Sequence, residues 1–276
     1  MGEFGDHGDV SAADRSTPLN EEPLAGGFVN AVVRVRDTVR RKAGPWTPTL
    51  QRLLRHARER GVTWVPEPRG FDEQGREVLA FIPGEVPHAM PPWVWTEPVL
   101  TDVAVALRRW HDATADFPRW GAVWGAAAHE PDEVICHNDF APYNCVFRDA
   151  RFAGAIDYDF CSPGPRLWDL AYTAYRFVPL MPPPGVALPD GIGGERSPFA
   201  EGEGRRRLDA FLEAYAEAGE RQLRYPRKEL VVWAVRRLGA IAEWTEAHVG
   251  GRADHPLADH ARMYRAHARW LDRRAG

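Results

Sequence analysis

The chain has 276 residues, 44% of them hydrophobic and 11 of them Trp, which is enough apolar material for one large core or for two lobes. The formal net charge of -4 and the isoelectric point near 6.2 argue against a general affinity for nucleic acid or for an anionic membrane surface. Three cysteines without a Cys-x-x-Cys pair favour a reducing compartment, and the lack of a signal peptide or a long apolar run predicts a cytoplasmic protein with no membrane partner.

The first part of the chain has the pattern of a small α+β lobe, for which we expect the bounds 21–84. Residues 1–20 are rich in Gly, Asp and Ser and are expected to form a disordered tail. Alternating apolar residues predict a β-hairpin within 28–41, and helical spacing behind an N-terminal Pro predicts a helix over 47–61. A strand is expected within 77–84, where a Pro-Gly pair ends it.

The remainder, residues 85–276, is expected to form a larger and mostly helical lobe. Apolar residues recur at helical spacing in four stretches, which are 97–114, 205–219, 227–249 and 259–272. Short apolar segments predict three strands, at 134–136, 145–147 and 152–158. Residues 179–204 are rich in Pro and Gly, and we expect a long surface loop there.

The residues that follow the first of these strands carry the strongest chemical pattern. Asp139 and Asn144 stand five apart in the pattern H-x-D-x-x-x-x-N, and Asp157 follows thirteen residues later at a strand end. In phosphoryl transfer from ATP, a carboxylate takes the proton of the acceptor hydroxyl while oxygen ligands hold Mg²⁺ against the phosphates. Asx residues also cap turns, which would explain either residue alone. The complete spacing favours the kinase-type interpretation.

Two segments make the chain resemble the aminoglycoside phosphotransferase family over roughly residues 24–250: HNDFAPYN, which begins at His137, and IDYDFCSPGPRLWDLA, which begins at Ile156. The resemblance implies a two-lobed protein-kinase-like fold of the α+β class. It implies a small β-rich N-terminal lobe, a mostly helical C-terminal lobe, and ATP with Mg²⁺ between them. The implied activity is transfer of the γ-phosphoryl group to a hydroxyl group of a small molecule.

The resemblance also implies a role for each polar residue of the two segments. Asp139 matches the catalytic base, and Asn144 and Asp157 match the ligands of the magnesium ion. Asp169 matches a family aspartate that braces the catalytic loop. His137 matches the catalytic-loop histidine of the family, and we expect it to be a hydrogen-bonded structural residue.

In the N-terminal lobe the resemblance is looser and concerns the nucleotide. Gly26 and Gly27 can be aligned with the kinase glycine loop, where backbone N–H groups approach phosphate oxygens, although an ordinary hairpin turn is the alternative. The segment VLAFIPG is similar to the family hinge, which implies that backbone groups of Ala80 and Ile82 bind the adenine edge. The alternative for this segment is a plain buried strand.

The strand lysine that holds the α- and β-phosphates in the family is absent. Arg40 stands in its place, or Arg41 if the alignment slips by one residue, and we prefer Arg40 because it follows an apolar neighbour on the predicted strand. An arginine keeps the positive charge and can bind phosphate through two N–H groups. Gln51 stands where the family has the helix glutamate that pairs with this lysine.

Two other kinds of function remain open. A non-catalytic nucleotide-binding or toxin-immunity-like protein on the same fold is favoured by the missing Lys–Glu pair. A metal-dependent hydrolase would use His137, Asp139, Asp157 and Asp159, although the sparse local histidines argue against it. For a kinase, an aminoglycoside, another antibiotic, an amino alcohol or a sugar would each fit as acceptor, and an antibiotic acceptor would imply antibiotic resistance.

Overall fold

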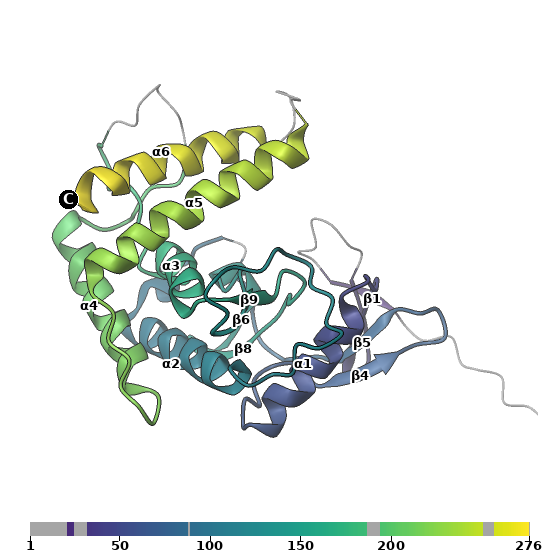
Figure 1. The fold of residues 1–276 in the computed structure, drawn as a ribbon. Coiled ribbons are helices and arrows are strands. Elements are labelled where there is room, and N and C mark those ends of the chain that lie inside the picture. The colour runs from purple at the N-terminus through teal and green to yellow at the C-terminus, as the bar shows by residue number, and fades with distance from the viewer. Residues whose placement is uncertain (1–20, 25–31, 88, 187–193, 251–256, 276) are drawn as a thin grey trace, which may run out of the picture.

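The structure is a computed structural model, and it describes residues 21–24, 32–87, 89–186, 194–250 and 257–275. An antiparallel sheet with the strand order β1-β2-β3-β5-β4 forms the N-terminal part. Its strands are β1 (Glu22–Pro23), β2 (Val33–Val35), β3 (Thr38–Arg41), β4 (Pro68–Phe71) and β5 (Glu77–Ala80). Helix α1 (Thr47–Glu59) lies beside this sheet (Figure 1).

The predicted hairpin and helix of this part are confirmed, and both follow from the local sequence. Val35 pairs with Thr38, so Arg36 and Asp37 form the turn between β2 and β3. In α1, residues spaced by three and four lie on one face of the helix. That face is buried through Leu50, Leu53, Leu54 and Ala57.

The C-terminal part is mostly helical. Its helices are α2 (Glu97–Thr114), α3 (Arg166–Phe177), α4 (Glu201–Glu217), α5 (Arg227–Val249) and α6 (Ala258–Ala275), with short 3₁₀ helices η1 (Pro92–Trp95) and η2 (Pro142–Asn144). Two small sheets pair β6 (Val134–Cys136) with β9 (Ser162–Gly164) and β7 (Cys145–Arg148) with β8 (Arg151–Ala155). Helices α5 and α6 lie side by side (Figure 1). No helix within the described ranges is long and apolar enough to cross a lipid bilayer.

One large hydrophobic cluster joins both parts of the molecule. It includes Leu50 of α1, Leu107 of α2 and Leu238 of α5, all fully buried. Apolar packing therefore holds the sheet-bearing part against the helical part, in addition to the covalent connection between them. Within the cluster, Trp110 Nε1 donates to the carbonyl oxygen of Ile135 at 2.7 Å, which fixes strand β6 against α2.

Helix α3 and strand β9 are among the observed elements that lie outside the predicted set, for different physical reasons. Every residue of α3 from Leu167 to Phe177 is buried, so its apolar residues do not mark one side of a helix. Strand β9 contains Pro163 and Gly164, which are residue types that weaken strands. Periodicity in the sequence therefore indicates neither element.

The segment 179–204 is not the simple surface loop that its composition predicts. Met181 and Ser197 are buried, and Arg176 of α3 forms an ion pair with Glu195 at 2.7 Å. These contacts attach the described residues of the segment to the helical part. The segment also ends earlier than expected, because α4 has already begun within it.

Helix α6 carries a buried histidine, His267, whose ionisation is coupled to folding. Its Nδ1 lies 2.8 Å from the hydroxyl of Tyr175. Burial, together with the nearby charge of Arg196, lowers the pKa of His267 from 6.5 to about 4. Between these two pH values the unfolded chain binds a proton that the folded chain excludes, so stability is lost as the pH falls through this window.

We expect this residue alone to lower the free energy of unfolding by at most about 1.4 kcal/mol for each pH unit below pH 6.5. In the variant His267→Gln, the side chain does not titrate in this pH range, so the free energy of unfolding should depend less steeply on pH. Denaturant titrations of both proteins at several pH values measure the difference. Curves that run parallel over the whole window would contradict the coupling.

Candidate active site

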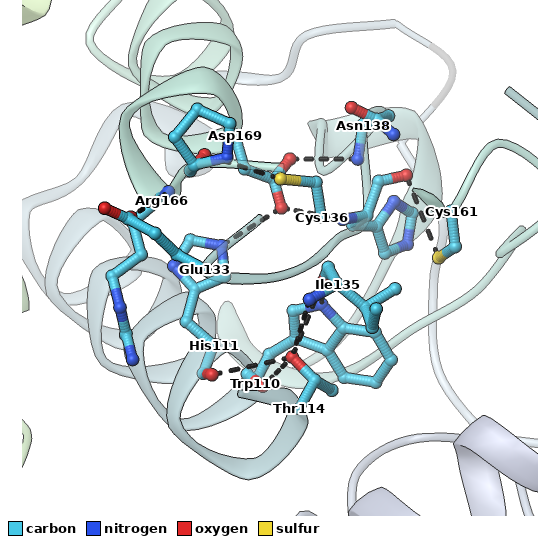
Figure 2. Close-up of polar contacts among 12 residues, drawn as sticks. Trp110, His111, Thr114, Glu133, Ile135, Cys136, Asn138, Cys161, Arg166 and Asp169 are labelled. Carbon is cyan, nitrogen blue, oxygen red and sulfur yellow. Dashed lines mark hydrogen bonds and ion pairs between the residues drawn. The ribbon is translucent and has the colours of Figure 1, made fainter. Parts of the chain in front are cut away.

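Strand β6 leads directly into the segment His137–Asp139, and a buried carboxylate holds this segment in place. Asp169 of α3 accepts a hydrogen bond from the backbone N–H of His137 at 2.7 Å. It also accepts one from the backbone N–H of Asn138 at 2.9 Å (Figure 2). Nε2 of His111, on α2, lies 3.1 Å from the same carboxylate. Asn138 has a left-handed φ of 66°, so these bonds stabilise a costly backbone conformation. Helices α2 and α3 thereby position the loop that carries Asp139.

The two histidines near this loop are buried, and burial sets their charge. It lowers the pKa of His111 against the opposing effect of Asp169, and it lowers the pKa of His137 to about 4. Burial also opposes ionisation of Asp169, but the hydrogen bond to His111 holds the pKa of this carboxyl below its usual value. The ring of His137 packs against Tyr158, with the centroids 4.7 Å apart. Its Nδ1 accepts a hydrogen bond from the backbone N–H of Asp139 at 3.4 Å, so His137 supports the loop by packing and by this bond.

Asp139, the predicted base, has a hydrogen bond to each carboxylate oxygen. The hydroxyl of Tyr143 donates to Oδ1 at 2.7 Å, and Nδ2 of Asn144 donates to Oδ2 at 2.8 Å. Burial raises the pKa of Asp139 to about 6, while the bond from Tyr143 lowers it. Each oxygen keeps a further lone pair, so the carboxylate can still accept a proton. A base with a pKa near the working pH is suited to this task.

The two predicted magnesium ligands are brought together by the β7–β8 sheet. Cys145 pairs with Ala155, and beyond this pair the N–H of Ile156 donates to the carbonyl oxygen of Asn144 at 2.9 Å. Asp157 follows with a left-handed φ of 62° and a side chain that is 45% exposed. A carboxylate and a carboxamide oxygen suit Mg²⁺, which needs few protein ligands because it keeps several waters. The donor set therefore fits a magnesium ion.

Two of the residues that the hydrolase alternative needs are buried or engaged in other contacts. Asp159 accepts hydrogen bonds from Nη2 of Arg41 at 2.7 Å and from Nε1 of Trp46 at 3.0 Å, while the His137 ring is buried. In the part of the chain that the structure describes, no three His, Cys, Asp or Glu side chains are grouped to hold a metal ion. The geometry therefore gives no support to a histidine- and aspartate-based metal centre.

The strand register places the two candidate phosphate-binding arginines, Arg40 and Arg41, on opposite faces of the sheet. Neighbouring residues of a strand point to opposite faces of the sheet. Arg41 is the residue on the face of the predicted metal ligand, with Nη1 3.5 Å from Oδ1 of Asp157. Arg40 points to the other face, where its Nε lies 3.6 Å from Asp72. The alignment that slips by one residue, with Arg41 in place of the lysine, is therefore the one that the structure favours.

The acidic partner of Arg41 comes from the sheet and not from the helix. Glu77 lies opposite Arg41 in the β3–β5 pairing, its side chain is fully buried, and its Oε2 accepts a hydrogen bond from Arg41 Nε at 2.6 Å. Gln51 of α1 donates to the other oxygen of Glu77 at 2.8 Å. Burial opposes the charge of Arg41, but Glu77, Asp159 and Asp157 hold the pKa of its guanidinium above the usual value. Gln51 thus orients the acid.

The other residues predicted to contact the nucleotide differ in whether their backbone N–H groups already have hydrogen-bond partners. Gly26 and Gly27 lie outside the described residues. The N–H of Ala80 already donates to the carbonyl oxygen of Glu67 at 2.9 Å, so it is not open to adenine. Ile82 lies just beyond β5, and its N–H has no backbone partner among the residues that the structure describes. Of the two hinge residues, Ile82 has the more accessible N–H.

Glu77 and Tyr143 contact the site although the sequence patterns do not assign them to it. Glu77 begins a predicted strand, and Tyr143 is one of the variable positions between Asp139 and Asn144. An acidic residue at the start of a strand that is expected to be buried indicates a buried ion pair, because such a charge needs a partner. The identity of that partner depends on strand register, which no local pattern contains.

Known proteins resemble this chain in sequence and in fold. The sequence model of the Phosphotransferase enzyme family (APH) matches residues 119–224, which include Asp139, Asn144, Asp157 and Asp169. The trifolitoxin immunity protein of Rhizobium leguminosarum bv. trifolii is 40% identical over 153 residues, which make up 52% of this chain and 58% of that protein. The alignment therefore spans little more than half the length of that relative.

Solved structures resemble the whole described fold. The choline kinase of Cryptosporidium parvum Iowa II gives a TM-score of 0.62 at 12% identity and covers 93% of this chain and 89% of its own. The ADP-bound aminoglycoside phosphotransferase APH(2'')-Ib gives a TM-score of 0.54 at 13% identity, with 91% and 94% covered. At such identities the likeness shows the fold alone, which is the predicted two-lobed protein-kinase-like fold. Together with the family match at residues 119–224, this fold confirms the resemblance to the aminoglycoside phosphotransferase family.

Proposed function

We propose that this chain transfers the γ-phosphoryl group of ATP, with Mg²⁺, to a hydroxyl group of a small molecule. The observation that carries the proposal is the partly buried carboxylate of Asp139, which accepts a hydrogen bond from the side chain of Asn144. The carbonyl oxygen of Asn144 in turn accepts a hydrogen bond from the N–H of Ile156, the residue before Asp157. A base and two oxygen donors in this arrangement are what phosphoryl transfer requires. The family match covers all three residues, and one structural neighbour is an ADP complex, which supports a nucleotide substrate.

In the proposed reaction each residue has a separate task. Asp139 accepts the proton of the acceptor hydroxyl as the hydroxyl oxygen bonds to the γ-phosphorus. Tyr143 and Asn144 each hold one oxygen of this carboxylate, so its orientation is set before the substrate binds. Arg41 supplies positive charge beside Asp157 for the phosphates. Asn144 and Asp157 would hold Mg²⁺, which when bound neutralises phosphate charge.

The metal assignment is tested by comparing two nearby aspartates. Asp157→Ala should abolish Mg²⁺-dependent binding of ATP, because the ion loses its carboxylate ligand. Asp159→Ala should reduce binding less, because Asp159 is engaged with Arg41 and Trp46. Calorimetric titration of ATP with and without Mg²⁺ measures both variants against wild type. A larger loss of ATP binding in Asp159→Ala would assign the role of metal ligand to Asp159. Binding of ATP to the wild-type protein that does not depend on Mg²⁺ would contradict the proposal.

A second candidate is a non-catalytic or toxin-immunity-like function on the same fold. It is favoured by the 40% identity to the trifolitoxin immunity protein. The two candidates differ in their need for a base. A screen of ADP formation against hydroxyl-bearing metabolites and antibiotics, with Asp139→Asn as the matched control, separates them. Turnover that depends on Asp139 supports the phosphotransferase, whereas nucleotide binding without any turnover selects the second candidate.

A further inference from the structure

The helical side of the proposed base, where α3 and α5 meet the loop of Asp139, is lined by tyrosine and arginine side chains. The hydroxyl of Tyr143, which donates to Asp139, lies 2.7 Å from the hydroxyl of Tyr172. The guanidinium of Arg176 lies 5.3 Å from the centroid of the Tyr143 ring, and that of Arg237 lies 5.1 Å from the centroid of the Tyr172 ring. Two positive charges therefore stand close to the base.

These two arginines differ in how their charge is balanced. Arg176 is paired with Glu195 at 2.7 Å. Arg237 has no carboxylate within ion-pair distance among the described residues, and its Nε is buried without a hydrogen-bond partner. Its Nη2 donates to the carbonyl oxygen of Asn138, the residue before Asp139, at 2.6 Å. A guanidinium carries five N–H donors, and with Nε buried and Nη2 bonded, Arg237 keeps its charge and the donors of Nη1 for a ligand.

An exposed aromatic pair continues the face of α5 that carries Arg237. Trp244 follows Arg237 by seven residues, which is two helical turns, so the two side chains project from the same side about 10 Å apart along the axis. The ring of Phe160 meets Trp244 edge to face, with centroids 5.8 Å apart, and the two residues are 37% and 46% exposed. Nδ2 of Asn138 donates to the carbonyl oxygen of Phe160 at 2.7 Å. Arg237 and Phe160 thus both contact Asn138, and Trp244 joins this group through Phe160.

We propose that the acceptor is a planar, anionic, hydroxyl-bearing small molecule whose carboxylate pairs with Arg237 and whose ring packs on Phe160 and Trp244. This acceptor class rests on the proposed phosphotransferase function and narrows the substrate of the same site. A carboxylate gains charge-assisted hydrogen bonds from the unpaired guanidinium. A polycationic or quaternary ammonium acceptor would instead be repelled by like charge next to the base.

The transfer step is the same for any acceptor of this class. The hydroxyl proton passes to the carboxylate of Asp139, and the hydroxyl oxygen forms a bond to the γ-phosphorus. The bond between the γ-phosphorus and the bridging oxygen breaks, and its electron pair leaves with ADP. The carboxylate that Arg237 holds takes no part in the bond changes, so Arg237 acts on acceptor binding.

Three probes of one shape and different charge test the inference: para-(hydroxymethyl)benzoate, para-(hydroxymethyl)benzamide and para-(hydroxymethyl)benzylamine. Wild-type protein with ADP and Mg²⁺ should bind the benzoate at least about tenfold more tightly than the benzylamine, the ratio expected from a hydrogen bond to a charged group. Saturation-transfer NMR and calorimetry measure binding without requiring turnover. Benzylamine binding as tight as benzoate binding, or no binding of any probe, overturns the proposal.

The neighbouring arginine supplies a matched control. Arg236 is exposed and lies over the ring of Trp233 at 5.1 Å from its centroid. Arg237→Gln should remove the preference for the benzoate, Arg237→Lys should keep part of it, and Arg236→Gln should leave it unchanged. Trp244→Ala should weaken binding of all three probes without changing their order. A preference that survives in folded Arg237→Gln, as judged by circular dichroism, overturns the proposal.

Measuring phosphoryl transfer to the same probes tests the anionic acceptor site and the phosphotransferase function separately. Preference for the benzoate without any ADP formation supports the anionic site and contradicts the phosphotransferase proposal. Transfer to the benzylamine in preference to the benzoate supports phosphotransfer and overturns the anionic acceptor. Transfer to the benzoate that is lost in Arg237→Gln supports both.

Discussion

Asp139→Asn is expected to lower the turnover number by about 100-fold or more, the usual scale for loss of a general base. The amide has nearly the shape of the carboxylate but cannot accept the proton of the acceptor hydroxyl. Its NH₂ group would also face either the donor Nδ2 of Asn144 or the hydroxyl of Tyr143, so one of the two present hydrogen bonds must change. Steady-state ADP formation, compared with wild type at saturating ATP, measures the effect.

Tyr143→Phe is the matched control for this variant. It removes one hydrogen bond to Asp139 but leaves the carboxylate, so its loss of turnover should be much smaller. Because the bond from Tyr143 lowers the pKa of Asp139, its removal should also shift the pH at which activity rises to a higher value. Thermal unfolding of both variants distinguishes a loss of chemistry from a loss of fold. Asp139→Asn with wild-type turnover would contradict the assignment of the base.

Arg41→Ala is expected to lower the free energy of unfolding by roughly 3 to 5 kcal/mol, as removal of one partner of a buried ion pair does. The Glu77 side chain is fully buried and would keep only the amide of Gln51 as a partner. Nucleotide affinity should fall as well, because the charge beside Asp157 is lost. Denaturant unfolding and titration with Mg²⁺-ATP measure the two effects.

A second substitution, at Glu77, tests whether the buried charge of Glu77 causes the loss of stability. In the double variant Arg41→Ala with Glu77→Gln, the charge of Glu77 is no longer buried without a cation. Part of the lost stability should therefore return while nucleotide affinity stays low. Arg40→Ala serves as the control on the opposite face of β3, where the nearest carboxylate is Asp72 at 3.6 Å, and its effects on both measurements should be smaller. A larger effect on nucleotide affinity in Arg40→Ala would restore Arg40 as the phosphate-binding residue.

The positions of Asp139, Asn144 and Asp157 relative to one another could be predicted from the sequence, because the pattern that they form is local. Asp139 and Asn144 lie in one short loop, and Asp157 lies beyond the strand that returns beside it. A hairpin of this kind brings its ends together through the pairing of two strands that are neighbours in the sequence. The spacing of residues therefore carries most of the geometry of this half of the site.

The Arg41–Glu77 pair shows why the other half could not be predicted in the same way. The two residues lie on strands that are separated in sequence by all of α1 and β4, and they meet only through the β3–β5 register. A shift of that register by one residue would exchange Arg41 for Arg40 on the site face. The apolar neighbour on which the sequence-based preference for Arg40 rests carries no information about this register.

The sequence by itself determined the α+β class, the amphipathic helices such as α1, and the polar residues of the loop, because each depends on residues close together in the chain. Only the tertiary structure decided that Arg41 faces Asp157, that Glu77 is its partner, and that Arg237 of α5 adjoins Asn138. These contacts join residues that are far apart in sequence. Their positions follow from the packing of whole strands and helices, where burial energy is spread over the core and no single local pattern encodes the result.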